Sequence, residues 1–248
     1  MTRLLTMIML VVALSLPFAA KAALVVDLDQ KQVSITTDFN GAELLLFGAL
    51  ELQEDDDIAI EVRGPLKNVA LRRKDKVAGI WLNTESATLT DIPSFYHILS
   101  TRPFDEIADA EERRRIGLGY ESLPFVLATG SRIDEGETSE WKEALARNME
   151  ASQLWQIHDG MVTTRKNALF RTDVVLPANI IPGQYDVRII HFRDGKMLNA
   201  EQSSIRVAKK GLSAKIFEMA HAYPPFYGIF AIIFAVSAGW LAAVAFRR

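Results

Sequence analysis

A short basic stretch is the first candidate for chemistry in this sequence. The segment "RRKDK" places four cationic side chains close together, and Arg63 precedes it at the end of an alternating stretch. Guanidinium groups bind carboxylate, sulfate or phosphate through two parallel hydrogen bonds. A site for a small anion or an acidic partner is therefore predicted at Arg63, Arg72, Arg73, Lys74 and Lys76. The commoner alternative is a solvated hairpin tip whose charges keep a sheet edge from aggregating.

An acidic stretch is the second candidate. The segment "ELQEDDDIAI" carries Glu51, Glu54, Asp55, Asp56 and Asp57, and carboxylate oxygens are the ligands that calcium needs. The stretch has no alternating D-x-D-x-D-G spacing, and neighbouring carboxylates on an extended chain point to different sides. We expect a solvated acidic loop and no metal site.

The histidines and serines form no known catalytic or metal-binding motif, and cysteine is absent. The four histidines, His97, His158, His191 and His221, form no H-x-x-x-H or H-x-H pair, so each is expected to be a lone histidine. The serines in "GYESL" and "TGSRI" miss the G-x-S-x-G pattern of a nucleophile elbow. The chain has no cysteine, which excludes disulfides and thiolate chemistry. We therefore predict a protein that is not an enzyme and needs no cofactor.

The charge balance argues against nucleic acid as a partner. The formal net charge is −3, and four basic residues lie outside positions 23–246, so the central part carries −7. A nucleic-acid binder is expected to be basic.

Strand patterns dominate residues 23–102. The segments "KQVSITTDF" and "DIAIEVRGP" alternate apolar and polar residues, and "AELLLFGAL" is a short buried run. The segment "NVALRRKDKVAGIWLNT" predicts two strands that meet around Lys74–Lys76. Turn signals recur about every 8 to 12 residues, and this spacing is typical of a β-sandwich. We place Trp81 in its interior, where Trp81→Ala would cost about 3 to 5 kcal/mol.

A helical insertion is predicted over residues 103–157. The segment "RPFDEIADAEERRRIGLG" has proline and acids early, arginines late and glycines at its end, which suits one helix and its dipole. A second helix is expected from about Glu140 to Ile157, with one apolar stripe formed by Trp141, Leu145, Met149 and Trp155.

Strands return over residues 158–208 and resemble the last strands of an immunoglobulin-like sandwich. The run Tyr185, Val187, Ile189 alternates, and Asp194-Gly195 is a hairpin turn. The pattern leaves open whether this region closes its own sandwich or completes the sheet that begins at Leu24.

Both ends of the chain carry membrane signals. Residues 226–246 contain no charged side chain and are long enough for one transmembrane helix. Residues 1–22 have a basic start, an apolar stretch and the A-x-A pattern of a signal peptide cleaved after Ala22; an uncleaved anchor is the alternative. Both interpretations of residues 1–22 place the chain between the two membrane segments outside the cytoplasm, and they place Arg247-Arg248 inside it. Residues 209–225 are predicted to be an amphipathic juxtamembrane segment that meets the lipid headgroups.

The predicted transmembrane helix carries a stripe of small side chains. Such residues permit close backbone approach between helices in lipid. The stripe is a candidate packing face for a membrane partner or a second copy, and it consists of Ala231, Ala235, Gly239 and Ala243.

The order of several blocks, spread over nearly the whole chain, resembles a known family. The blocks are "LLLFGA", "EVRGPLKNVALRRKDKVAGIWLNT", "IPSFYHILSTRPFDEI", "LFRTDVVLPANIIPGQYDVRIIHFRDG" and "AHAYPPFYGIFAIIFAVSAGWLAAVAFRR". Together they are similar to the alphaproteobacterial transmembrane protein family Alph_Pro_TM. The resemblance implies a signal peptide, a periplasmic region and one C-terminal span in the bacterial inner membrane. It supplies no activity and no catalytic residue.

The sequence therefore predicts a mainly β protein: an immunoglobulin-like β-sandwich in the periplasm with a helical insertion and one C-terminal transmembrane helix. The function favoured is a membrane-anchored accessory or interaction protein, associated with an envelope transporter or with a second copy. The alternatives are a periplasmic binder of a small anion and, less favoured, an unrecognised hydrolase.

Overall fold

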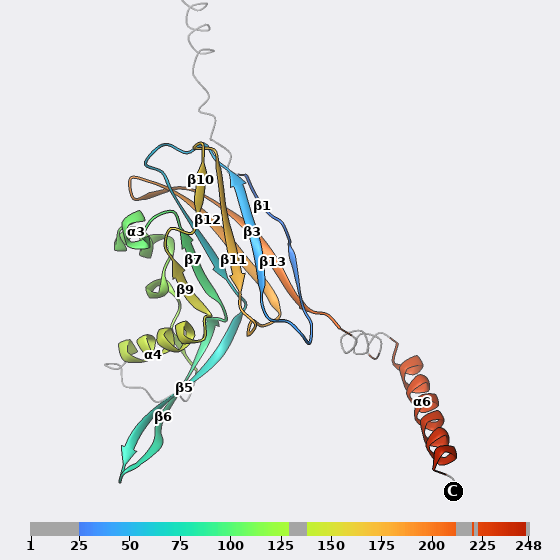
Figure 1. The fold of residues 1–248 in the computed structure, drawn as a ribbon. Helices are drawn as coiled ribbons and strands as arrows, with labels where there is room; N and C mark the ends of the chain where they lie inside the picture. Colours follow the sequence, from blue (N-terminus) through green and yellow to red (C-terminus); the bar gives the residue numbers. More distant parts are fainter. Residues whose placement is uncertain (1–24, 129–137, 212–219, 221–222, 247–248) are drawn as a thin grey trace, which may run out of the picture.

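The structure, a computed structural model, describes residues 25–128, 138–211, 220 and 223–246. It is mainly β, as predicted, with 48% strand and 25% helix among the described residues. Figure 1 shows strands in layers, helices on one side, a hairpin that leaves the body and a separate C-terminal helix. The predicted signal peptide, residues 1–22, and most of the predicted juxtamembrane segment lie outside the described residues.

The first sheet has four strands in the order β1-β3-β11-β10. All of its neighbouring pairs are antiparallel. Its strands are β1 (Val25–Leu28), β3 (Ala42–Ala49), β10 (Thr163–Arg165) and β11 (Leu169–Leu176).

The second sheet has six strands in the order β2-β13-β12-β4-β7-β9. Its central pairs are antiparallel, whereas β2 joins β13 and β9 joins β7 in parallel. Its strands are β2 (Gln32–Ile35), β4 (Asp57–Arg63), β7 (Tyr96–Ser100), β9 (Trp155–His158), β12 (Gly183–Arg193) and β13 (Lys196–Lys209).

The two predicted β regions build one sandwich. Strand β3 pairs with β11 along its whole length, and β4 pairs with β12, so each sheet takes strands from both regions. Buried side chains of both sheets belong to one core cluster, which includes Leu46, Ile60, Phe170 and Ile189. The question that the sequence pattern left open is thereby answered.

The helices between β7 and β10 cover the outer face of the second sheet (Figure 1). Strand β4 has six buried residues in succession, because one of its faces meets the first sheet and the other lies under this layer. The helices of the layer are α2 (Phe104–Ile107), α3 (Ala110–Ile116), the 3₁₀ helix η1 (Tyr120–Ser122) and α4 (Thr138–Ala151).

Two helix predictions need correction. The first predicted helix is two helices, because Ala108 adopts an extended conformation and Asp109 caps α3 by accepting a hydrogen bond from the Glu112 amide. The second ends at Ala151, and Trp155 lies on β9 instead. The rest of its predicted stripe is buried as expected: Trp141, Leu145 and Met149.

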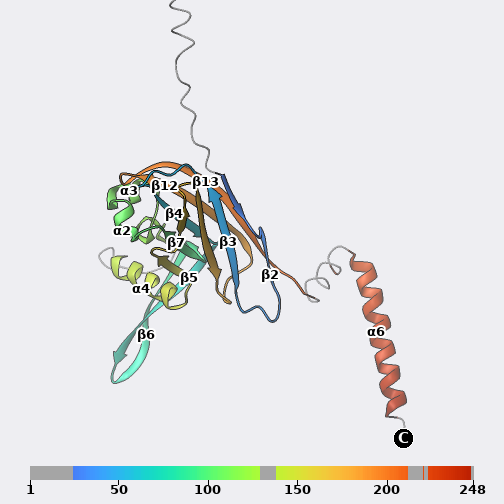
Figure 2. The same ribbon diagram turned by 45° about the horizontal axis from the view of Figure 1, so that its top comes forward.

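A long hairpin extends away from the sandwich in both views (Figures 1 and 2). It consists of β5 (Leu66–Val77) and β6 (Ile80–Pro93), and the two-residue strand β8 (Val126–Leu127) joins it near its root. The hairpin turns at Ala78 and Gly79, whose φ angles of 51° and 85° are typical of a type I′ turn. The prediction that the strands meet at Lys74–Lys76 was wrong, because those residues still belong to β5.

The hairpin also overturns the placement of Trp81. This side chain is 66% exposed near the hairpin tip and does not lie in the sandwich. The last long element is α6 (Pro224–Ala245). Its segment Tyr227–Ala245 is apolar and long enough to cross a bilayer, and none of it is buried by the rest of the chain.

These positions reverse our expectation for tryptophan substitutions. Trp81→Ala should change the free energy of unfolding by no more than about 0.5 kcal/mol, because an exposed ring loses few contacts. Trp155→Ala should cost about 3 to 5 kcal/mol, because this ring is 2% exposed and its Nε1 donates a hydrogen bond to the Pro93 carbonyl. Unfolding of the detergent-solubilised protein, followed by its β circular-dichroism signal, measures both. Equal losses would contradict the arrangement.

Candidate functional site

The predicted basic site is divided between the end of β4 and the hairpin. Arg63 lies at the end of β4 and bonds to Glu61 at 2.7 Å, whereas the other four residues lie in the outer half of β5. Arg72, Lys74 and Lys76 are exposed there. The structure therefore does not bring Arg63 together with the cationic group near the tip.

Arg73 has a structural role that the sequence pattern did not reveal. Its guanidinium lies 2.9 Å from Glu85 across the hairpin and 2.8 Å from Glu140 on α4. It also covers the Trp141 ring at 5.2 Å. Because these contacts join β5, β6 and α4, Arg73 fixes the base of the free part of the hairpin against the helical layer.

The hairpin tip is the feature that the sequence reasoning missed. Four large apolar side chains there are between 47% and 66% exposed: Val77, Ile80, Trp81 and Leu82. Such clustered exposure is typical of an interaction surface. The signal in the sequence was the unbroken run "IWL" directly after Ala-Gly, since a half-buried strand would alternate.

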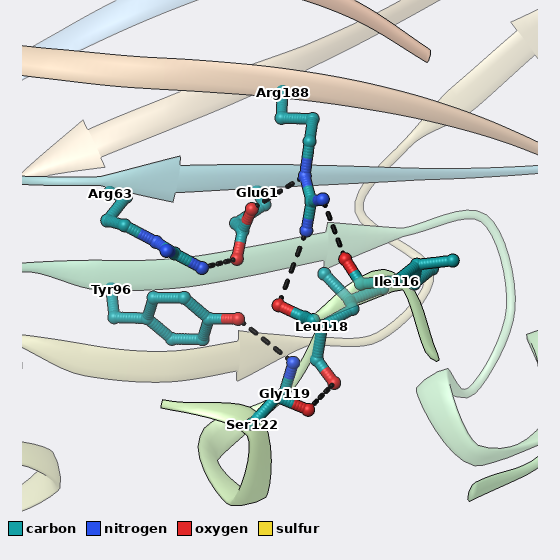
Figure 3. Close-up of polar contacts among 9 residues, drawn as sticks. Glu61, Arg63, Tyr96, Ile116, Leu118, Gly119, Ser122 and Arg188 are labelled. Carbon is teal, nitrogen blue, oxygen red and sulfur yellow. Dashed lines mark hydrogen bonds and ion pairs between the residues drawn. The ribbon is translucent and has the colours of Figure 1, made fainter. Parts of the chain in front are cut away.

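A buried ion-pair network lies on β4 and β12, where the sandwich meets the helical layer (Figure 3). The Glu61 side chain is 4% exposed and pairs with Arg63 at 2.7 Å and Arg188 at 2.8 Å. Arg188 also donates to the carbonyl oxygens of Ile116 and Gly117. The network thus connects β4, β12 and the end of α3.

Tyr96 secures the same segment from a neighbouring strand. Its hydroxyl oxygen accepts a hydrogen bond of 2.9 Å from the Gly119 amide (Figure 3). Burial, reinforced by the charge of Glu61, raises the pKa of Tyr96 far above its usual range. The tyrosine therefore stays neutral, and these contacts hold residues 116–119 on the sheet.

The acidic stretch is less solvated than predicted. Asp56 bonds to both Arg193 and His191, and the Arg193 contact keeps the pKa of Asp56 well below its usual range. Asp57 accepts hydrogen bonds from Thr101 and Arg102. These two carboxylates fix the start of β4 and do not converge on a common point.

Two of the four histidines come together. The rings of His97 and His158 lie 5.0 Å apart, and His97 stacks on Phe95 at 4.0 Å. Burial lowers the pKa of His97 to about 4, so this ring is neutral at ordinary pH. Within the described residues, no three histidines or acids lie close enough to hold a metal ion.

Several hollows lie away from the hairpin tip, and two of them are mainly apolar. One, of about 380 Å³, is an apolar depression over β1, β3, β10 and β11, lined by Val25, Phe47 and Leu169 among others. The other, of about 270 Å³, lies between α4 and residues 120–125 beside Trp155. Neither contains a cluster of acids, bases and nucleophiles that points to a reaction.

The small-residue stripe of α6 is open along its length. Ala231, Ala235, Gly239 and Ala243 are all exposed. A Cβ placed on Gly239 would meet no atom within 4 Å. The stripe therefore has no packing role within the part of the chain that the structure describes.

Together, fold and site define a class: a β-sandwich protein with a helical layer, a projecting hairpin with an apolar tip and one C-terminal helix of membrane-spanning length. The chain belongs to the family described as "Putative transmembrane protein (Alph_Pro_TM)", whose model matches residues 23–248. This match confirms the predicted resemblance over almost the whole chain.

Other comparisons add little. No curated protein matches the chain in sequence. Among solved structures, the chain is similar to AggA, the major subunit of aggregative adherence fimbriae type I from Escherichia coli. That match has 7% sequence identity and a TM-score of 0.27, and it covers 77% of this chain and 97% of AggA.

Glu61→Gln tests the buried network. The substitution keeps the shape but leaves Arg63 and Arg188 without a compensating charge, so it should lower the free energy of unfolding by about 3 kcal/mol. Hydrogen exchange should also accelerate at residues 116–119, which Arg188 and Tyr96 hold. Glu121→Gln is the control, because Glu121 is exposed beside the same segment. Equal effects of the two substitutions would show that the network is unimportant.

Proposed function

We propose that the protein is an exported, membrane-anchored interaction subunit of the bacterial envelope, and that it has no catalytic role. The single observation that carries this proposal is the β5–β6 hairpin, whose four exposed apolar side chains lie well away from the core. A monomeric protein gains nothing from such a surface in water, and exposed apolar clusters mark sites of contact.

The anchoring part of the proposal rests on α6. Its apolar segment is long enough for the bilayer core. The A-x-A pattern at Ala20–Ala22 and the terminal Arg247-Arg248 support an exported body and a cytoplasmic C-terminus. In a bacterium with two membranes, we therefore propose that the β-sandwich lies in the periplasm and α6 in the inner membrane.

Topology is tested by fusion of alkaline phosphatase after Lys209. The enzyme is active only outside the cytoplasm, so the fusion should be active, and the mature protein should begin at Ala23 by mass spectrometry. A matched fusion after Arg248 should be inactive. An inactive Lys209 fusion together with a protease-protected body would overturn the export proposal.

An integral membrane partner is the second part of the proposal. We propose that α6 packs through its small-residue stripe on a transporter in the same membrane, or on a second copy of this chain. Close approach across small residues is a main source of helix association in lipid. The absence of contacts at Gly239 within the described chain leaves this face available to another helix.

Gly239→Leu should abolish copurification of the transporter or second copy from detergent, because a leucine there separates the two backbones. Insertion and the amount of protein in the membrane should be unchanged. Ile232→Leu is the matched control, since it changes an exposed apolar residue of α6 outside the stripe. If both variants copurify the same partner equally well, α6 is only a tether.

A further inference from the structure

The hairpin tip presents apolar side chains on both of its faces. Residues paired directly across an antiparallel ladder share a face, and successive pairs alternate. Val77 pairs with Ile80, whereas Trp81 pairs with Lys76, so these two pairs lie on opposite faces. Leu82, one pair further along, returns to the face of Val77 and Ile80. A flat protein surface would cover only one face of the hairpin tip. A fluid lipid phase would surround both faces, so lipid fits this distribution of apolar side chains better.

Basic residues lie close to the apolar side chains of the tip, with one acid, Asp75, among them. Lys76 lies beside Trp81, and Lys74 and Arg72 come next toward the root; all three are exposed. Lysine and arginine side chains extend toward anionic headgroups while their stems lie on apolar surface. Tryptophan is enriched at the same depth of a bilayer. The tip therefore combines exposed apolar side chains with nearby basic ones, which suits the boundary between the headgroups and the acyl chains of a bilayer.

The root of the hairpin and the membrane tether leave the sandwich at the same end. Pro65 precedes β5 and lies against Gly183, since a Cβ on Gly183 would be 2.7 Å from the Pro65 ring. Gly183 pairs with Val207, close to the end of β13 at Lys209. Figure 1 shows β5 and β6 leaving the body at the end where β13 finishes.

Chain lengths permit the tip to reach the bilayer that holds α6. Strand β5 has 12 residues and spans about 40 Å at about 3.3 Å per residue. The chain between Lys209 and Pro224 can span at most about 50 Å at about 3.5 Å per residue. The hairpin and the tether thus cover similar distances from the same end of the sandwich.

We infer that the tip of the β5–β6 hairpin inserts into the anionic headgroup region of the membrane that holds α6. This inference rests on the proposed function, and it names phospholipid as the partner of that contact surface. The inserted residues are Val77, Ile80, Trp81 and Leu82, with Lys74 and Lys76 at the phosphates. The body then has two attachments to one membrane, the tether and the hairpin.

The absence of cysteine makes a direct test available. In the full chain, Ile80→Cys is labelled with an environment-sensitive fluorophore and reconstituted into vesicles of phosphatidylethanolamine and phosphatidylglycerol. We expect a blue shift of the emission, quenching by nitroxides carried on the lipid and loss of quenching by iodide in the water. Thr164→Cys on β10 is the control, because it is exposed at the opposite end of the sandwich and should show the reverse (Figure 1).

Two changes should weaken the insertion without unfolding the body. Adding Trp81→Ser to the labelled chain removes the largest exposed ring, and it should reduce lipid quenching while the β circular-dichroism signal stays the same. Vesicles of phosphatidylcholine alone remove the anionic headgroups and should also reduce it. Quenching at position 80 that responds to neither change would overturn the assignment of these residues.

A second readout separates the lipid inference from the proposed function. A photo-crosslinker at position 80 is activated in intact cells. If the fluorophore stays exposed to water in all vesicles but position 80 crosslinks to one envelope protein, the lipid inference is wrong and the interaction function stands. If the tip meets neither lipid nor protein, both are wrong.

Discussion

The pairing of β4 with β12 is the interaction on which the rest of the structure depends. It joins residues 57–63 to residues 186–192 and places both strands in the middle of the six-stranded sheet. Because β3 and β11 pair in the same way in the other sheet, the two halves of the chain cannot form separate cores. The helical insertion is consequently confined to the outside of a closed sandwich, where it serves as a second cover for β4.

Glu61 shows how this constraint reaches the surface layer. A carboxylate on a central strand is costly to bury unless charges and hydrogen bonds satisfy it. Two arginines do so here, and one of them, Arg188, extends past Glu61 to the carbonyl groups at the end of α3. The network thus specifies where the insertion sits on the sheet. Arg73 has the corresponding role between α4 and the hairpin.

The sequence predicted the parts of the fold that depend on local pattern. Alternation identified β2, β4 and β12, whereas β9 was predicted as part of a helix. Gly117 marked the end of α3 because its φ of 70° suits glycine. Contacts between distant residues could not be predicted. Asp56 looked solvated because its partners, His191 and Arg193, lie more than a hundred positions away. Trp81 looked buried because an apolar strand and a projecting apolar hairpin have the same composition. The candidate site was therefore placed on the basic residues next to the tip and missed the tip itself.

The position of β13 determines how the sandwich would bear a mechanical load. Its last residues pair with β12 on one side and β2 on the other, and the chain leads from Lys209 toward α6. Ladder hydrogen bonds run roughly across the strands, so tension applied along β13 at Lys209 would shear many of them at once instead of opening them one after another. A body attached in this way can be pulled by its membrane helix without unravelling from the attached end.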